Sequence, residues 1–353
     1  MKKITVLPSW CFRDDAGNQL DLQLLRLLGA VHRRGKLTQA AEDVGISYRH
    51  AWSVLRQGNA FFGVALVELQ RGRGAQLTPL GDKLLWAEQR AVARLGPQLE
   101  SLGSELNLAI AREQQGAVSV LRLYASHGFA VELLPKHLTA LPLDLQYCSP
   151  HESLAALDRG SCDVAGFHLP RGAVGEHIRA SYHERLNPRE HRVIGFITRT
   201  QGLMVAPNNP LGIEGVASLA LEGVRFVNRQ ASSGTRSLLD GLLNEAGVAS
   251  TAIRGFEVEE FTHSAVAAYV AAGMADVGFG VQAGAEKFGL DFIALATEDY
   301  LLACRHQALK ESRLQAFLDV LGSDAFQQAV QTLPGYRLSR CGEVMTVEEV
   351  LAP

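Results

Sequence analysis

Residues 224–243 have the sequence VRFVNRQASSGTRSLLDGLL, and this stretch decides what kind of fold the chain adopts. Residues 224–228 are predicted to form a buried strand, and from Leu238 onward leucines recur at helical spacing. The residues between them form a loop that begins a helix. A strand followed by a loop and a helix is the repeating unit of α/β folds.

The loop is rich in groups that bind an anion. Free N–H groups at a helix N-terminus, the positive end of the helix dipole and hydroxyl donors all favour a bound anion. An ordinary N-cap explains one serine or threonine, but not two serines and a threonine between two arginines. We therefore expect ligand contacts from Arg229, Ser232, Ser233, Gly234, Thr235 and Arg236. Arg236 lies in the first helical turn and could instead pair with an acidic surface residue.

Length and charge indicate more than one domain. The chain has 353 residues, enough for two or three domains. Residues 1–100 carry 14 Lys and Arg against 9 Asp and Glu, whereas the remainder is acidic. This asymmetry suggests a nucleic-acid-binding module joined to a different one.

Several classes of protein are disfavoured. The five cysteines contain no CxxC pair, so neither a metal framework nor a disulfide set is expected. No apolar run reaches membrane-spanning length, and the first residues are not those of a signal peptide. These features predict a cytoplasmic protein without membrane contact, metal or cofactor. Residues 176–192 carry His177, His183 and His191, which we interpret as a solvated, charged face and not as metal ligands.

Residues 37–55 have the pattern of a helix-turn-helix, preceded by a helix predicted over 20–31. Ala40 and Ala41 let two helices approach closely, Gly45 provides the tight turn and Ser47 caps the second helix. Residues 61–81 predict a basic hairpin, or wing. The residues expected to contact DNA are Thr38, Ser47, Tyr48, Arg49, His50, Ser53 and Arg56, with Arg71 and Arg73 from the wing. Trp52 and Leu55 are predicted to face the core.

A long helix is predicted to follow, from about residue 80 to about residue 111. Its apolar spacing suggests a dimer seam. Pro97 is expected either to kink this helix or to split it in two. A short strand is also predicted over 3–12, before the first helix.

Residues 20–81 resemble the winged-helix domain of LysR-type regulators, and within them the molybdate-responsive branch. The matching residues are 37–41, the run 47–52 with the sequence SYRHAW, and 77–81. This resemblance implies a homodimer that binds a palindromic operator in double-stranded DNA.

Residues 118–332 alternate predicted strands and helices, the pattern of an α/β domain. Ligands in such domains gather at the C-terminal ends of strands. Ser126 and His127 follow a strand at 118–125, His168 ends a strand at 163–168, and Thr262 and His263 precede a helix at 265–272. Further strands are predicted at 193–198, 201–206, 253–256, 292–295 and 299–304. The similarity of 162–167 to 275–280 suggests two related lobes.

Residues 118–340 resemble the type II periplasmic-binding-protein fold, as found in molybdate-responsive regulators and in some molybdopterin-biosynthesis proteins. Arg229 followed by residues 233–235 is also similar to the pattern of phosphate and tungstate receptors. We expect a winged helix-turn-helix at 1–82, a linker and dimerisation helix at 83–116 and a two-lobed ligand domain at 117–353. Lobe 1 is expected at about 117–202 and 296–353, and lobe 2 at about 203–295.

The sequence therefore predicts a DNA-binding transcriptional regulator that senses a small oxyanion, with molybdate or tungstate favoured. Arg229 carries more charge than a plain molybdate site requires, so phosphate-like or organic anions stay open. The alternative is an enzyme or accessory protein of molybdenum-cofactor biosynthesis that binds a phosphorylated pterin-like ligand. We find no catalytic triad or paired carboxylates, so no catalytic residues are expected.

Overall fold

The computed structural model describes residues 4–9, 11–20, 23–70, 74–115 and 119–352. The chain divides into two compact units, one of Leu7–Val92 and one of Ala93–Pro353 together with the residues before Leu7. Within the described ranges, no helix is long and apolar enough to cross a membrane.

The first unit is a helix-turn-helix with a wing. It contains α1 (Gln23–Arg34), α2 (Leu37–Val44), α3 (Tyr48–Phe62) and the antiparallel strands β1 (Val67–Gln70) and β2 (Gly74–Leu77). Ala40 and Ala41 are buried between the helices, as predicted. Gly45 ends α2 with a left-handed φ of 75°, and the Ser47 hydroxyl accepts a hydrogen bond from the His50 backbone N–H at 3.2 Å. The turn and the cap predicted from the sequence are therefore confirmed.

The strand predicted over 3–12 is wrong for the residues that the structure describes there. The described residues of this segment pair with no other strand. The nearest strand-like pairing is one isolated bridge between Arg13 and Gln19. Ile4 instead bonds the side-chain amide of Asn107, which donates to the Ile4 carbonyl at 2.7 Å and accepts from its N–H at 2.8 Å.

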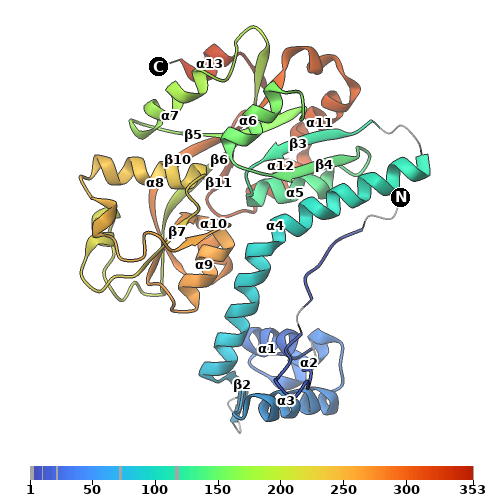
Figure 1. The fold of residues 1–353 in the computed structure, drawn as a ribbon, viewed down its shortest axis with the longest axis vertical. Helices are drawn as coiled ribbons and strands as arrows, with labels where there is room; N and C mark the ends of the chain where they lie inside the picture. The colour runs from blue at the N-terminus through green and yellow to red at the C-terminus, as the bar shows by residue number, and fades with distance from the viewer. Residues whose placement is uncertain (1–3, 10, 21–22, 71–73, 116–118, 353) are drawn as a thin grey trace. The chain divides into compact units, whose positions relative to one another are not determined.

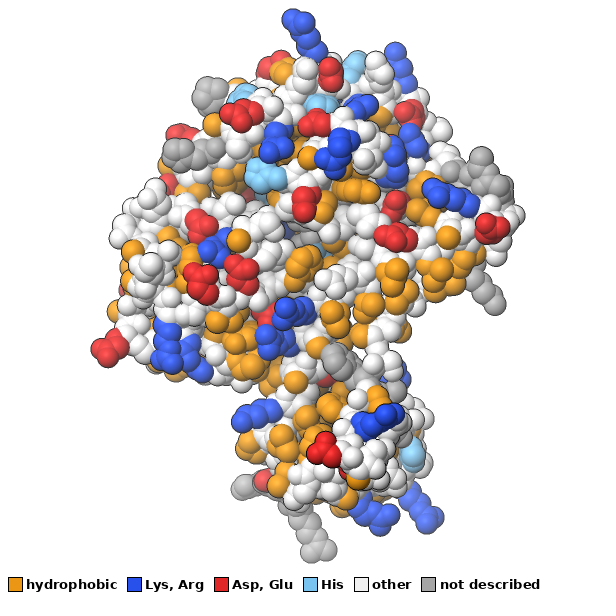
Figure 2. All heavy atoms as spheres, in the orientation of Figure 1, with side chains coloured by type: hydrophobic (Ala, Val, Ile, Leu, Met, Phe, Trp, Pro, Cys, Tyr) orange, Lys and Arg blue, Asp and Glu red, His pale blue; other side chains and the backbone are white. Residues whose placement is uncertain are grey.

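Helix α4 (Pro79–Gln115) is a single helix of 37 residues. Pro97 lies inside it and does not split it. In the second unit, Leu102 and Leu106 of α4 are exposed, and Figure 2 shows hydrophobic side chains gathered along the course of this helix.

The second unit is built on one mixed sheet of ten strands in two lobes (Figure 1). The sheet order is β4-β3-β5-β10-β6-β9-β7-β8, with β11 and β12 paired to β6. The strands are β3 (Leu121–Ala125), β4 (Leu143–Tyr147), β5 (Val164–Pro170), β6 (His191–Val205), β7 (Phe226–Arg229), β8 (Glu259–Glu260), β9 (Val277–Val281), β10 (Asp291–Arg305), β11 (Tyr336–Leu338) and β12 (Val344–Met345).

Two long strands, β6 and β10, pass from one lobe to the other. They pair antiparallel along most of their 15 residues, with β5 beside β10 in one lobe and β9 beside β6 in the other. The sequence predicted two short strands in place of each. Arg199 and Gln201 interrupt the apolar pattern of β6, but the backbone ladder continues through them. The strand predicted at 253–256 is also wrong, because these residues form a turn.

Helices cover both faces of the sheet. They are α5 (Phe129–His137), α6 (Pro150–Asp158), α7 (Val174–His183), α8 (Gly234–Glu245), α9 (His263–Ala271), α10 (Gln282–Lys287), α11 (Ser312–Gly322), α12 (Asp324–Gln331) and α13 (Val347–Leu351), with short 3-10 turns at Val216–Ala220, Ser250–Ala252 and His306–Lys310. Separate hydrophobic cores form under them in each lobe. The solvated face expected over 176–192 is wrong for His191, which is buried at the start of β6 and accepts from the Asn187 N–H at 3.1 Å.

Candidate functional site

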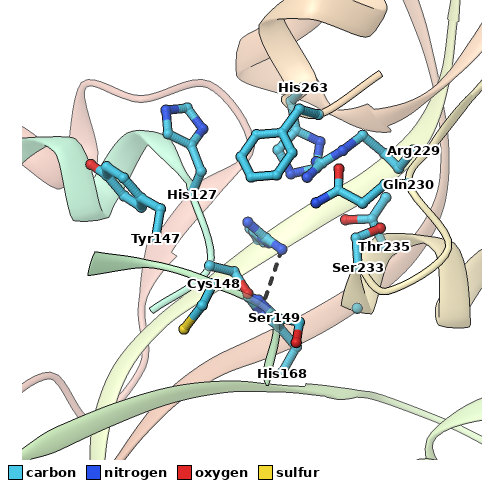
Figure 3. Close-up of a pocket in the computed structure, with 14 residues that line it drawn as sticks. His127, Tyr147, Cys148, Ser149, His168, Arg229, Gln230, Ser233, Thr235 and His263 are labelled. Carbon is cyan, nitrogen blue, oxygen red and sulfur yellow. Dashed lines mark hydrogen bonds between the residues drawn. The ribbon is translucent and has the colours of Figure 1, made fainter. Parts of the chain in front are cut away.

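A small cavity lies between the two lobes, beside the crossing strands (Figure 3). It is lined by Ser126, His127, Tyr147, Cys148, Ser149, His168, Arg199, Arg229, Gln230, Ser233, Gly234, Thr235, Phe261 and His263. Its volume is about 20 Å³, measured as the space that the centre of a water-sized sphere can occupy. A water molecule needs roughly 10–15 Å³ by this measure, so the cavity has the size of a small ion and not of an organic metabolite.

Eight of the residues predicted for the ligand site meet in this cavity. They are Ser126, His127, His168, Arg229, Ser233, Gly234, Thr235 and His263. They come from the ends of β3, β5 and β7 and from the starts of α8 and α9. Strand ends of two lobes therefore converge on one point, although the residues are far apart in the chain.

Three predicted residues do not line the cavity. Ser232 is exposed to solvent. Arg236 binds Asp240 at 3.0 Å and Glu259 at 3.1 Å, as the alternative of a surface ion pair anticipated. Thr262 uses its hydroxyl to cap α9. Their side chains are directed to solvent or already bonded within the protein, and the predicted ligand contact of these three residues stays a prediction that the cavity lining does not support.

Four helices begin at the cavity. The N-caps are Gly128 for α5, Ser149 for α6, Ser233 for α8 and Thr262 for α9. Each start exposes backbone N–H groups and the positive end of a helix dipole. Their convergence on so small a space makes it favourable for a negative charge.

Gly234 is required at the start of α8. A Cβ atom built there would lie 2.9 Å from Cδ2 of His168. The absent side chain lets the helix backbone approach the opposite lobe closely.

A buried ion pair that the sequence analysis missed lies in the crossing strands. Nε of Arg199 donates to Oε1 of Glu298 at 2.5 Å, and the amide of Gln201 donates to the same oxygen at 2.6 Å. The Gln201 amide also donates to the hydroxyl of Thr235 at 3.1 Å. Charged residues inside otherwise apolar strand patterns were the available signal. The sequence also missed Tyr147, Cys148, Ser149, Gln230 and Phe261.

Arg229 has no carboxylate partner among the described residues. Its Nε and Nη1 atoms are buried and donate to no partner among the described residues, and the whole residue is 4% exposed. Burial, and then the charge of Arg199, lower the pKa of Arg229 to about 9. The guanidinium is still protonated at neutral pH. Glu298 pairs with one of the two buried arginines, Arg199, whereas no ion pair of Arg229 is found among the described residues, so its buried positive charge is unpaired.

The buried histidines are neutral donors and acceptors. Burial and the nearby arginine charges hold the pKa values of His168 and His263 well below their usual range. Nδ1 of His168 faces Nη2 of Arg199 at 3.4 Å (Figure 3), and both ring nitrogens of His263 lack a partner among the described residues. At the cavity edge, His127 pairs with Glu132 at 2.9 Å and contacts the Tyr147 ring.

The predicted DNA-contacting residues lie on α2 and α3 of the first unit. Thr38, Ser47, Tyr48, Arg49, His50 and Arg56 are exposed, and Ser53 is half-buried. Leu55 is buried as predicted, but Trp52 is 45% exposed, so its predicted core position is wrong. Trp52 is one helical turn after Tyr48 and one turn before Arg56, and it therefore shares their face of α3. Arg71 and Arg73 lie outside the described residues.

No group of three or more His, Cys, Asp and Glu side chains that could hold a metal ion occurs within the part of the chain that the structure describes.

Comparison with known proteins adds the family. Residues 131–322 match the PBP superfamily domain, and residues 22–82 match the bacterial regulatory helix-turn-helix protein, lysR family. The chain belongs to the PBP superfamily and carries a LysR-family helix-turn-helix domain. This LysR-family protein is a ligand-responsive transcription regulator and not an enzyme.

The relatives span different parts of this LysR-family chain. YvgK of Bacillus subtilis (strain 168) is 30% identical over 228 residues, which are 63% of this chain and 73% of YvgK. Molybdenum-pterin-binding protein MopB of Rhodobacter capsulatus is 33% identical over 121 residues, 33% of this chain and 44% of MopB. A hydrogen-peroxide-bound mutant of Corynebacterium glutamicum OxyR has a TM-score of 0.45 at 18% identity, over 89% of this chain and 93% of that chain.

Proposed function

We propose that this regulator senses a small oxyanion, molybdate or tungstate, in the cavity between its lobes. The uncompensated charge of buried Arg229 carries this proposal. A buried cation without a partner is costly, and a bound anion would supply the missing charge. Bidentate hydrogen bonding to oxygen suits a guanidinium.

The lining of the cavity supports a fully deprotonated anion. None of the 14 lining residues is an aspartate or a glutamate, so a dianion meets no repelling carboxylate there. Neutral donors surround Arg229, from four helix N-termini and from the hydroxyls of Ser126, Ser233 and Thr235. The small volume disfavours a phosphorylated pterin. The similarity to MopB, whose name assigns it molybdenum-pterin binding, favours molybdenum chemistry for this chain.

We infer that the regulator acts as a homodimer on a palindromic operator. Leu95, Leu99, Leu102 and Leu106 repeat at alternating intervals of four and three along α4, the spacing of a coiled-coil seam. Leu95, Leu102 and Leu106 are exposed, and a second α4 of the same kind would cover them. Each copy would then present Tyr48, Arg49 and Trp52 of its α3 to one half-site.

The test uses the full-length protein and isothermal titration with molybdate, tungstate, sulfate, phosphate and a pterin phosphate. We expect molybdate and tungstate to bind the wild-type protein and to lose at least about tenfold in affinity in Arg229→Ala, since a charged hydrogen bond contributes about 1.5–3 kcal/mol. Arg236→Ala is the matched control, because Arg236 lies seven residues further along the chain but pairs with Asp240 and Glu259. Equal affinity of Arg229→Ala and the wild-type protein for molybdate would refute the site.

A further inference from the structure

Pro97 leaves one backbone carbonyl of α4 without its helical partner. In an α-helix the N–H of each residue donates to the carbonyl four residues earlier. Proline has no N–H, so the carbonyl of Ala93 receives no such bond from Pro97. A helix interior tolerates this only where another donor satisfies the free oxygen.

The donor comes from the ligand-binding lobe that carries α9. The hydroxyl of Thr262 donates to the Ala93 carbonyl at 3.0 Å, and it accepts from the Ala265 N–H at 2.9 Å. Thr262 is fully buried, and it is the N-cap residue immediately before His263, which lines the anion cavity. The proline thus leaves a free carbonyl in α4, and the N-cap residue of α9 donates a hydrogen bond to it.

A second contact joins α4 to the other lobe. The hydroxyl of Tyr147 donates to Oε2 of Glu100 at 2.8 Å. Tyr147 lines the cavity, and its ring contacts the imidazole of His127 with a centroid distance of 5.0 Å. One turn further along α4, the Ser104 hydroxyl bonds the carbonyl of Leu143 and the N–H of Leu145, both at 2.9 Å. Helix α4 is thereby held against the edge strand β4.

We call the Ala93–Thr262 and Glu100–Tyr147 hydrogen bonds the two lobe contacts of α4. They lie within two turns of one helix, each is made to a different lobe, and each lobe partner is a cavity residue or its immediate neighbour. A rotation of one lobe relative to the other changes the distance between Thr262 and Tyr147. Both contacts can be kept only where Thr262 stays within reach of Ala93 and Tyr147 stays within reach of Glu100 on the same helix.

We propose that these two lobe contacts transmit the anion signal to α4. The inference rests on the proposed anion-sensing function. An anion that closes the lobes favours the arrangement in which α4 keeps both contacts, and the helix thereby distinguishes the bound from the free protein. Pro97, Thr262 and Glu100 are positioning residues that act through α4 and do not touch the anion.

The experiment compares hydrogen–deuterium exchange of the full-length protein with and without sodium molybdate or sodium tungstate. Two segments are followed, the cavity loop at 230–236 and the α4 segment at 93–107. In the wild-type protein we expect the oxyanion to slow exchange in both segments, by at least about fivefold in α4.

Two variants remove the lobe contacts without altering a cavity side chain. Pro97→Ala restores the N–H that competes with Thr262 for the Ala93 carbonyl, and Glu100→Ala removes the acceptor of Tyr147. Both variants should keep the oxyanion-dependent protection of the cavity loop and lose most of that in α4. Gln98→Ala is the matched control, because it changes an exposed residue of the same helix outside the two contacts.

The outcomes separate the two proposals. A wild-type α4 that does not respond while the cavity loop does, or variants whose α4 responds as in the wild-type protein, would overturn the role of the lobe contacts. A cavity loop that responds to neither oxyanion in any of the proteins would contradict the anion-sensing function itself, and the inference would fall with it.

Discussion

Arg199 and Glu298 face each other across β6 and β10, and their side chains form an ion pair that is almost completely buried at the point where these strands cross between the lobes. The amide of Gln201 donates to the same carboxylate oxygen and to the hydroxyl of Thr235 in the first turn of α8. The charge balance of the cavity therefore depends on two strands that hold the lobes together.

Glu298→Gln removes the carboxylate that pairs with the buried Arg199 of the cavity. Breaking a buried ion pair from one side costs about 3–5 kcal/mol, and we expect a loss of that size in the free energy of unfolding. Urea denaturation in oxyanion-free buffer measures it. Saturating molybdate should recover part of the loss, because it replaces the missing charge. A stability equal to that of the wild-type protein would contradict the assigned role.

Arg229→Met should have the opposite effect on stability. It replaces a buried, unpaired cation by an apolar side chain of similar length, and so removes the desolvation cost of that charge. We expect a melting temperature at least as high as that of the wild-type protein in oxyanion-free buffer, together with loss of the molybdate-induced increase. A strongly lowered melting temperature would show that Arg229 has a protein partner and is not reserved for a ligand.

Acidification should destabilise the protein through His168 and His263. Their pKa values are lowered in the folded state, whereas unfolded histidine titrates near 6.5. Below that pH the unfolded chain takes up protons that the folded chain does not, so this stability is present above about pH 6.5 and is lost as the pH falls below it. The slope approaches about 1.4 kcal/mol per pH unit for each histidine.

Urea denaturation between pH 8 and pH 5 measures this dependence. His263→Gln should reduce the slope below pH 6.5, whereas His306→Gln, on an exposed residue, should leave it unchanged. An identical slope in His263→Gln and the wild-type protein would show that His263 is not kept neutral by the fold.

Trp52→Ala separates DNA contact from packing in α3. Because Trp52 is exposed beside Tyr48, its removal should change the free energy of unfolding by less than about 0.5 kcal/mol. Leu55→Ala, at a buried position of the same helix, should cost about 2–5 kcal/mol. We expect Trp52→Ala to weaken binding to DNA fragments selected in vitro by the wild-type protein, as measured by gel shift. Unchanged DNA affinity would remove Trp52 from the recognition surface.

Local sequence determined the features that depend on neighbouring residues. The turn at Gly45 and the Ser47 and Ser233 caps each involve residues within about one helical turn, so their residue types suffice to predict them. The positions of Ser126, His127, His168 and Arg229 beside the ends of short strands followed from the same local patterns. The local signal failed where polar residues interrupt a long strand, as in β6.

Only the tertiary structure decided which of these groups meet and which charges remain unpaired. Arg229 ends β7 and Arg236 lies in the first turn of α8, yet Arg229 enters the cavity and Arg236 binds Asp240 and Glu259 on the surface. Arg199 meets Glu298, 99 residues later in the chain, only because β6 and β10 pair antiparallel. The sequence alone shows that Pro97 frees a carbonyl, but the donor that satisfies it is Thr262, 169 residues from Ala93. Electrostatic balance and hydrogen-bond partnership depend on distances in space, which local residue patterns do not contain.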